Sequence, residues 1–275
     1  MKCAWDPVFS ILPPWLRSEV DRQGREDLLE LRLRLDALPE FVYFGGSRWA
    51  GRKTVKEDLS FCVNTACRYS PWTAASSASG FLTVQGGHRI GLCGEAVCKN
   101  GEVTGFREIH SLCIRIARDI TGGASKIAAK DRSLLILGAP GWGKTTLLRD
   151  YSRKIAQEHT VTVIDERKEL FPPGFERGRR MDVLYGCPKR EGIEMALRTM
   201  GPEYIAVDEI TAGEDCDAIT RASGCGVRLI ATAHAGSLQD FRRNKVYRAL
   251  LDADVFETAV ILRKDRSFRE ERIVQ

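Results

Sequence analysis

The hydrophobic positions in the first part of the chain recur with a period of two and are separated by turn residues. Residues 29–35 alternate leucine with glutamate or arginine, which is the pattern of a half-buried β-strand. Thr54 and Glu57 have the spacing of a capping box, which predicts a helix that starts after Thr54. Strands are predicted at residues 29–35, 81–84, 90–93, 103–106 and 113–117. The pattern predicts an α+β domain with an antiparallel sheet over residues 1–118.

A segment rich in turn residues, 119–131, follows and is predicted to be a linker with a short helix. After it, continuous apolar runs alternate with stretches of helical period, which indicates a parallel sheet covered by helices on both faces. The runs lie at 134–137, 160–164, 204–207 and 227–232, and a closing antiparallel hairpin is predicted at 255–262 and 267–274. Residues 171–190 hold several prolines, glycines and basic residues and are predicted to form a long loop. We therefore predict a second, α/β domain over residues 132–275.

The first of these apolar runs leads into a G-x-x-x-x-G-K-T motif and then into a helical pattern. This strand–loop–helix context is the one that a phosphate-binding P-loop requires. Its backbone N–H groups and the helix N-terminus favour an anion, Lys144 can reach the β- and γ-phosphates, and Thr145 can bind Mg²⁺. The nucleotide-binding residues are predicted to be Gly138, Ala139, Pro140, Gly141, Trp142, Gly143, Lys144, Thr145 and Thr146.

Two carboxylates, Asp208 and Glu209, directly follow the apolar run 204–207. A carboxylate that ends a strand beside a P-loop supports Mg²⁺, and a second one can polarise the attacking water. We predict that Asp208 acts on the metal and that Glu209 is the general base. The alternative is an acidic helix cap, which the helix dipole would also favour.

Polar residues also follow two other runs, with Glu166 after 160–164 and His234 after 227–232. Ligands of open α/β sheets bind beyond the carboxyl ends of the strands, so both side chains are expected to converge with Lys144 in one catalytic crevice. His234 taken alone is better explained as an ordinary loop histidine, and its place after a strand of this sheet is what favours a role in the site.

With these motifs, the chain resembles the secretion ATPase superfamily, whose members drive type II and type IV secretion and pilus assembly. A narrower likeness is to the stage III sporulation AA family of endospore formers. The segments that carry it are 31–34, 86–91, 114–118, 178–180 and 182–189. Two features depart from the superfamily pattern: Trp142 occupies a P-loop position usually held by a small residue, and Thr211-Ala212 stands where relatives often carry an arginine.

The resemblance implies a RecA-like P-loop domain that hydrolyses ATP with Mg²⁺ and a homo-oligomeric, hexameric ring. It also implies catalytic arginines from the N-terminal domain, and Arg89, Arg115 and Arg118 match the arginine-bearing strands of the family. The implied role is to power a secretion-like channel between mother cell and forespore, with membrane proteins as partners.

Composition adds limits on the class of protein. At 275 residues and 43% hydrophobic content, the chain can bury one large core or two moderate ones. No apolar run approaches the roughly 18–20 residues of a membrane-spanning helix, and the start of the chain lacks the apolar stretch of a signal peptide. These observations predict a soluble, cytoplasmic protein, and the resemblance implies that a place at the membrane would come through its partner proteins.

Two other functions are compatible with a P-loop. A nucleic-acid-stimulated ATPase or translocase is the main alternative, and the basic segment 241–248, read as one helix, is its best support. The net charge of +5 is mild, however, and does not call for a nucleic-acid partner. A small-molecule kinase is a third option, but the adjacent acids Asp208 and Glu209 favour hydrolysis.

Overall fold

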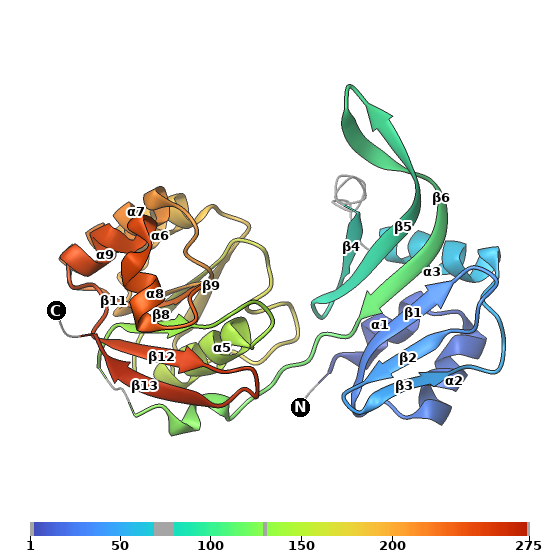
Figure 1. Cartoon of the computed structure of the whole chain (residues 1–275), viewed down its shortest axis with the longest axis horizontal. Coiled ribbons are helices and arrows are strands. Elements are labelled where there is room, and N and C mark those ends of the chain that lie inside the picture. Colours follow the sequence, from blue (N-terminus) through green and yellow to red (C-terminus); the bar gives the residue numbers. More distant parts are fainter. Residues whose placement is uncertain (1–2, 69–79, 129–130, 274–275) are drawn as a thin grey trace. The chain divides into compact units, whose positions relative to one another are not determined.

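The structure is a computed structural model that describes residues 3–68, 80–128 and 131–273. The chain divides into two compact units (Figure 1). Unit 1 runs to Asp119 and includes Pro172–Gly174, while unit 2 begins at Ile120 and holds the rest. Residues 129–130 of the predicted linker and residue 274 of the last predicted strand lie outside the described residues. The short helix expected in the linker is a single 3-10 turn, Gly123–Lys126.

Unit 1 is built on one antiparallel sheet with the strand order β3-β2-β1-β6-β5-β4. Its strands are β1 (Leu28–Arg34), β2 (Glu40–Tyr43), β3 (Gly46–Trp49), β4 (Phe81–Val84), β5 (His88–Lys99) and β6 (Glu102–Arg115). Its helices include α1 (Trp5–Ile11), α2 (Pro14–Gln23) and α3 (Lys56–Arg68). The alternation in β1 works as predicted, because Leu31 and Leu33 are buried in the core of the unit.

The start of α3 differs from the predicted capping box. The helix begins at Lys56, and the hydroxyl of Thr54 makes no hydrogen bond. Asp58 takes the capping role instead, since its carboxylate accepts hydrogen bonds from the Val55 N–H at 3.1 Å and from the Trp15 indole at 2.7 Å. The Trp15 ring, which is distant in sequence, therefore holds Asp58 in the capping position that the spacing had assigned to Glu57.

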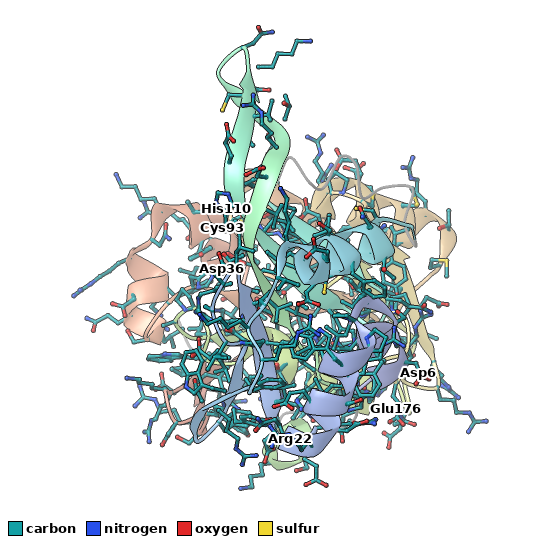
Figure 2. The ribbon with its side chains drawn as sticks, turned by 90° about the vertical axis from the view of Figure 1, so that its right-hand side faces the viewer. Asp6, Arg22, Asp36, Cys93, His110 and Glu176 are labelled. Atoms are coloured by element: carbon teal, nitrogen blue, oxygen red, sulfur yellow. The ribbon has the colours of Figure 1, made fainter. Side chains whose placement is uncertain are left out.

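Strands β5 and β6 form a two-stranded ribbon that projects from the sheet (Figure 1). Cys93 and His110 mark the base of the projecting part (Figure 2). The predicted strands 103–106 and 113–117 are parts of this one long strand, β6, so their separation was wrong. The sequence also predicts a turn at Asn100 and Gly101, and this turn is the tip of the ribbon.

Unit 2 contains a seven-stranded sheet with the order β13-β12-β7-β11-β10-β8-β9, in which all pairs are parallel except β12 with β13. Its strands are β7 (Leu134–Leu137), β8 (Val161–Asp165), β9 (Met181–Tyr185), β10 (Tyr204–Val207), β11 (Arg228–Ala233), β12 (Thr258–Leu262) and β13 (Phe268–Arg272). Its helices include α5 (Lys144–Ile155), α6 (Lys189–Thr199), α7 (Gly213–Gly224), α8 (Leu238–Arg243) and α9 (Arg248–Asp252).

The apolar runs are continuous because both faces of this sheet are covered. In β7, Leu134 and Ile136 belong to the core cluster of α5, whereas Leu135 and Leu137 belong to the cluster of α6 and α7. Successive side chains of a strand point to opposite faces, so a strand covered on both faces is mostly apolar along its length. This layering confirms the predicted α/β class.

The prediction of a long loop at 171–190 was wrong, because the segment contains β9. This strand pairs in parallel with β8 at the edge of the sheet, from Met181 opposite Val161 to Tyr185 opposite Asp165. It is only half-buried and is flanked by glycine and proline, so its sequence lacks the continuous apolar run of the inner strands. The edge position of β9 explains why the pattern failed there.

Candidate nucleotide site

The P-loop joins β7 to α5 in unit 2. Gly141 and Gly143 have φ angles of 77° and 99°, which residues with a Cβ rarely adopt. Gly143 is the residue immediately before α5, so the turn aims backbone N–H groups and the positive end of the helix dipole at one place. The loop thus has the conformation expected of an anion cradle.

Lys144, the first residue of α5, is buried with its ammonium between two acceptors. Its Nζ lies 3.2 Å from the Ala139 carbonyl oxygen and 3.0 Å from Nδ1 of His234. Burial lowers the pKa of Lys144, although Glu209 and Asp208 act in the opposite direction. An ammonium that has lost much of its hydration gains more from a nearby polyanion than one in water.

Thr145 and Asp208 form a pair of oxygen ligands suited to Mg²⁺. The Thr145 hydroxyl donates to Oδ2 of Asp208 at 3.0 Å, and the Thr232 hydroxyl donates to Oδ1 of the same carboxylate at 2.7 Å. One hydroxyl and one carboxylate beside a phosphate cradle match the way proteins bind Mg²⁺, with few protein ligands and the remaining ones from water and phosphate. The residues therefore fit the metal that the P-loop implies.

Glu209 follows Asp208 in a strained conformation, with a φ of 42°. Its backbone N–H donates to the Thr232 hydroxyl at 2.8 Å, which helps to hold that conformation. Its carboxylate lies 2.9 Å from Nε2 of His234 and 3.7 Å from the Arg167 guanidinium. Strain of this kind concentrates at functional sites, and here it directs the carboxylate of Glu209 to His234.

The acids at the end of β8 have separate roles. Asp165 is buried, and its carboxylate accepts hydrogen bonds from the N–H groups of Glu169 and Phe171 at 2.8 and 2.9 Å. Burial raises the pKa of Asp165, and these hydrogen bonds oppose the rise. Glu166 pairs with the ammonium of Lys189 at 2.6 Å, and both line a cavity with Thr145, Asp208 and Glu209. The sequence placed Lys189 in a basic loop, so its burial beside Glu166 was not predicted.

Comparison with known proteins gives the family. The sequence model described as "Sporulation stage III, protein AA" matches residues 16–272. The chain belongs to this stage III sporulation protein AA family. It is 33% identical to the stage III sporulation protein AA of Bacillus subtilis (strain 168) over 270 residues, which cover 91% of this chain and 88% of that protein. The family predicted from the motifs is therefore confirmed.

Solved structures of secretion ATPases share the fold of this family member. The Legionella pneumophila ATPase DotB is similar with a TM-score of 0.61 at 15% identity, over 95% of this chain and 80% of DotB. The pilus retraction motor PilT with bound ADP is similar with a TM-score of 0.62 at 16% identity, over 90% of this chain and 77% of PilT. These likenesses confirm the predicted RecA-like fold.

Trp142, in the P-loop, is the first of the two departures from the superfamily pattern. Its side chain is half-buried and packs against the core cluster of α5. Its bulk is thus accommodated by the nucleotide-binding unit itself. The other departure, Thr211-Ala212, is held by Asp215, whose carboxylate accepts hydrogen bonds from both N–H groups at 3.0 and 3.3 Å.

The three arginines predicted to be catalytic lie in unit 1. Arg89 on β5 and Arg115 on β6 are direct cross-strand neighbours, and Arg115 lies 3.6 Å from a carboxylate oxygen of Glu30. Arg118 was expected to lie on a strand of the sheet, but β6 ends at Arg115 and Arg118 follows it. Its guanidinium donates to the carbonyl oxygens of Leu28 and Arg25, so it connects the segment after β6 to the start of β1 and the turn before it.

His88, in one of the segments that carry the resemblance, has a structural role in unit 1. Its Nε2 lies 2.8 Å from the Ala4 carbonyl oxygen, and its Nδ1 accepts a hydrogen bond from the Ala117 N–H at 3.0 Å. The ring is buried, and burial lowers the pKa of His88 to about 4. His88 therefore connects the beginning of the unit to the end of β6.

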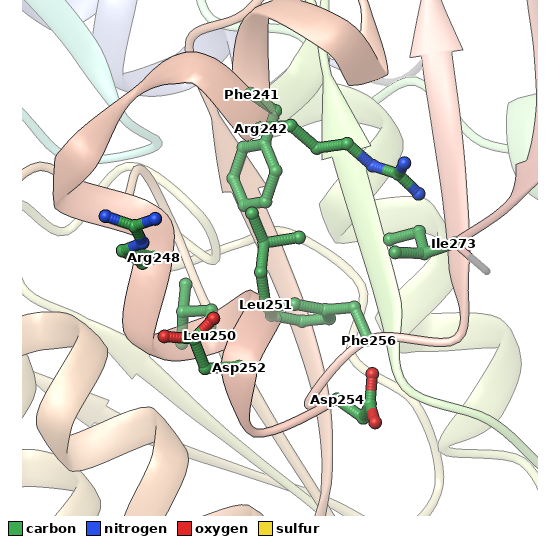
Figure 3. Close-up of a pocket in the computed structure, with 9 residues that line it drawn as sticks. All are labelled: Phe241, Arg242, Arg248, Leu250, Leu251, Asp252, Asp254, Phe256 and Ile273. Carbon is green, nitrogen blue, oxygen red and sulfur yellow. The ribbon is translucent and has the colours of Figure 1, made fainter. Parts of the chain in front are cut away.

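A second hollow, of about 350 Å³, lies in unit 2 (Figure 3). It is lined by Phe241, Arg242, Arg248, Leu250, Leu251, Asp252, Asp254, Phe256 and Ile273. The segment 241–248 that was read as one basic helix is broken, because α8 ends at Arg243 and Asn244 caps the next turn through its side chain. The hollow also brings two aspartates beside the two arginines, which weakens the case for a nucleic-acid surface.

Within residues 3–68, 80–128 and 131–273, no helix has the length and apolar character needed to cross a membrane.

Proposed function

We propose that the protein is a Mg²⁺-dependent ATPase that works in sporulation. The observation that carries the proposal is a set of close contacts at the carboxyl ends of parallel strands. Lys144 of the P-loop contacts His234, Thr145 donates to Asp208, and His234 contacts Glu209 in turn. The similarity of fold to PilT, whose structure contains ADP, supports a nucleotide as the ligand. Membership of a sporulation family supports the biological setting.

Each residue has a chemical task in this proposal. Lys144 neutralises the charge of the β- and γ-phosphates, while Thr145 and Asp208 hold Mg²⁺. Bound Mg²⁺ supplies Lewis-acid stabilisation of the charge on the transferred phosphoryl group. Glu209 accepts a proton from the attacking water. His234, which contacts one oxygen of the Glu209 carboxylate, orients that carboxylate.

The test is phosphate release from ATP by the whole chain, with two variants that separate binding from chemistry. Glu209→Gln keeps the shape of the side chain but cannot accept a proton, so it should bind ATP normally and lose turnover by roughly 10²-fold or more. Lys144→Ala should weaken binding itself. Glu102→Gln, on the exposed ribbon, is the control. Hydrolysis by Glu209→Gln at the rate of the unmodified chain would contradict the assignment of the base.

We further propose that the protein assembles into a hexameric ring and that Arg89 or Arg115 acts on ATP bound by a neighbouring copy. Arg115 is 67% exposed, which supports its availability to a partner, whereas Arg118 is already bonded to backbone carbonyls. Specific activity should then rise with protein concentration. Mixing Arg89→Ala or Arg115→Ala with Glu209→Gln should restore part of the activity, because some interfaces regain both groups; no rescue at any ratio would count against the ring.

The proposed cellular role is to power a channel between mother cell and forespore through membrane partners. The B. subtilis relative provides the assay. A B. subtilis strain that lacks its stage III sporulation protein AA should form spores when it carries this chain and should not when it carries Glu209→Gln. Equal spore counts from the two would separate the role in sporulation from ATP hydrolysis.

A further inference from the structure

Lys189 is a buried cation in the nucleotide site that none of the roles above uses. It is the first residue of α6, its side chain is only 9% exposed, and its Nζ lies 2.6 Å from Oε2 of Glu166 and 3.9 Å from Oδ2 of Asp215. An ammonium loses hydration when it is buried. A positive charge in the first turn of a helix also opposes the helix dipole. Neither burial nor helix stability explains a lysine here, so its two carboxylate partners must.

Those partners belong to two different segments of unit 2. Glu166 directly follows β8, and Asp215 lies in the first turn of α7. The Asp215 carboxylate also accepts hydrogen bonds from the N–H groups of Thr211 and Ala212, so it fixes the segment that follows Glu209. Lys189 therefore joins Glu166 to the segment that carries the predicted base.

The location of the pair gives Glu166 access to the metal. Glu166 and Lys189 line the same cavity as Thr145 and Asp208, the two residues that fit Mg²⁺. The Glu166 side chain is 37% exposed, so its carboxylate is open to the cavity on the side away from Lys189. A fixed carboxylate that lines the same cavity as the metal ligands would act on metal-bound water, as outer-shell partners do in other metal sites.

We propose that Lys189 is a positioning residue that holds the Glu166 carboxylate toward the hydrated Mg²⁺ that Thr145 and Asp208 would bind. This inference rests on the proposed function and adds to it that Mg²⁺ binding depends on Lys189. Glu166 then strengthens Mg²⁺ binding through water, and Glu209 remains the base.

Mg²⁺ binding tests the proposal without turnover. A fluorescent, non-hydrolysable ATP analogue is bound to the whole chain, first with a chelator and then during a Mg²⁺ titration. Lys189→Met should bind the analogue equally well in the chelator and lose roughly 10-fold in Mg²⁺ affinity. Lys189→Arg should recover part of that loss, which a purely structural role for the side chain would not give. Arg190→Met is the matched control, because Arg190 is the next residue of α6, is half-exposed, and forms an ion pair with Glu194 on the same helix.

Glu166→Gln links the two residues. It should cause a similar loss, and adding Lys189→Met to it should cause no further loss, since both changes remove the same interaction. Additive losses, or an unchanged Mg²⁺ affinity in Lys189→Met, would overturn the proposal. If Lys189→Met does not fold, an unchanged Mg²⁺ affinity in Glu166→Gln overturns it equally well. Failure of the unmodified chain to bind the analogue would instead reject the proposed function, and the role of Lys189 with it.

Discussion

His234 and Glu209 are joined by a contact of 2.9 Å between Nε2 and Oε1. The other ring nitrogen of His234, Nδ1, lies 3.0 Å from the ammonium of Lys144. Because an ammonium can only donate, Nδ1 must accept, and Nε2, the nitrogen that faces Glu209, then carries the proton. His234 therefore connects the phosphate-binding lysine to the predicted base through one defined tautomer.

This connection predicts the effect of removing the ring. His234→Ala should lower kcat up to about 10²-fold, because the Glu209 carboxylate loses the partner that orients it. Affinity for ATP should change much less, since Lys144 keeps its contact with the P-loop. Steady-state kinetics and nucleotide titration measure the two effects. His110→Ala, on the exposed ribbon, should change neither, and a loss confined to ATP affinity would contradict the orienting role.

Thr232 should contribute to both stability and activity. Its hydroxyl donates to Asp208 and accepts from the N–H of Glu209, so Thr232→Val leaves two groups without their partner. We expect a loss of roughly 1–3 kcal/mol in the free energy of unfolding, measured by urea denaturation, together with a lower kcat. Thr104→Val changes an exposed hydroxyl of the ribbon and should leave stability within about 0.5 kcal/mol. Equal stability of the two variants would show that Thr232 is not required to hold the strained Glu209.

Substitutions at Gly143 and Gly224 distinguish the effect of backbone conformation from the effect of steric clash. A Cβ on Gly143 or on Gly224 would meet no atom within 4 Å, but only Gly143 has a positive φ. Gly143→Ala should therefore destabilise the chain by about 1 kcal/mol or more and weaken nucleotide binding, because the loop must deform. Gly224→Ala, within a helix, should be neutral or slightly stabilising. Thermal unfolding with and without ATP distinguishes them, and identical behaviour would contradict the conformational requirement.

His88 should make unit 1 sensitive to acid. Its folded pKa of about 4 lies below the ordinary value of 6.5, so the unfolded chain binds the proton more readily. The stabilisation is complete above pH 6.5 and is lost as the pH falls toward 4, by roughly 3 kcal/mol over the whole range. Denaturant unfolding of His88→Gln should show a weaker dependence on pH across this interval than the unmodified chain. His110→Gln is the control, and parallel curves for His88→Gln and the unmodified chain would exclude His88 as the cause.

The sequence was sufficient for the features that local chemistry determines. The P-loop needs glycine at positions of positive φ and a buried strand before it, and both leave a clear local pattern. Asp208, Glu209 and His234 could be brought together with Lys144 because parallel strands end at the same edge of a sheet. The alternation in β1 similarly revealed its buried face.

What the sequence did not reveal depends on partners far away in the chain. Strand β9 is half-buried at a sheet edge, so its pattern resembles that of a loop until its neighbour β8 is known. Lys189 could not be distinguished from a solvated lysine, because only the fold places Glu166 and Asp215 beside it. Asp58 replaced the predicted cap of α3 because Trp15, 43 positions away, supports it.

The ribbon of β5 and β6 has a practical consequence. Residues 95–104 are all exposed, and none of them belongs to the core clusters formed by the described residues. The hydrogen bonds of this stretch can open without exposing either core, so its amide protons should exchange with solvent long before those of β1 or β7. The turn at Asn100 and Gly101 is consequently the position where a fluorophore or an affinity peptide can be inserted with the least cost to folding.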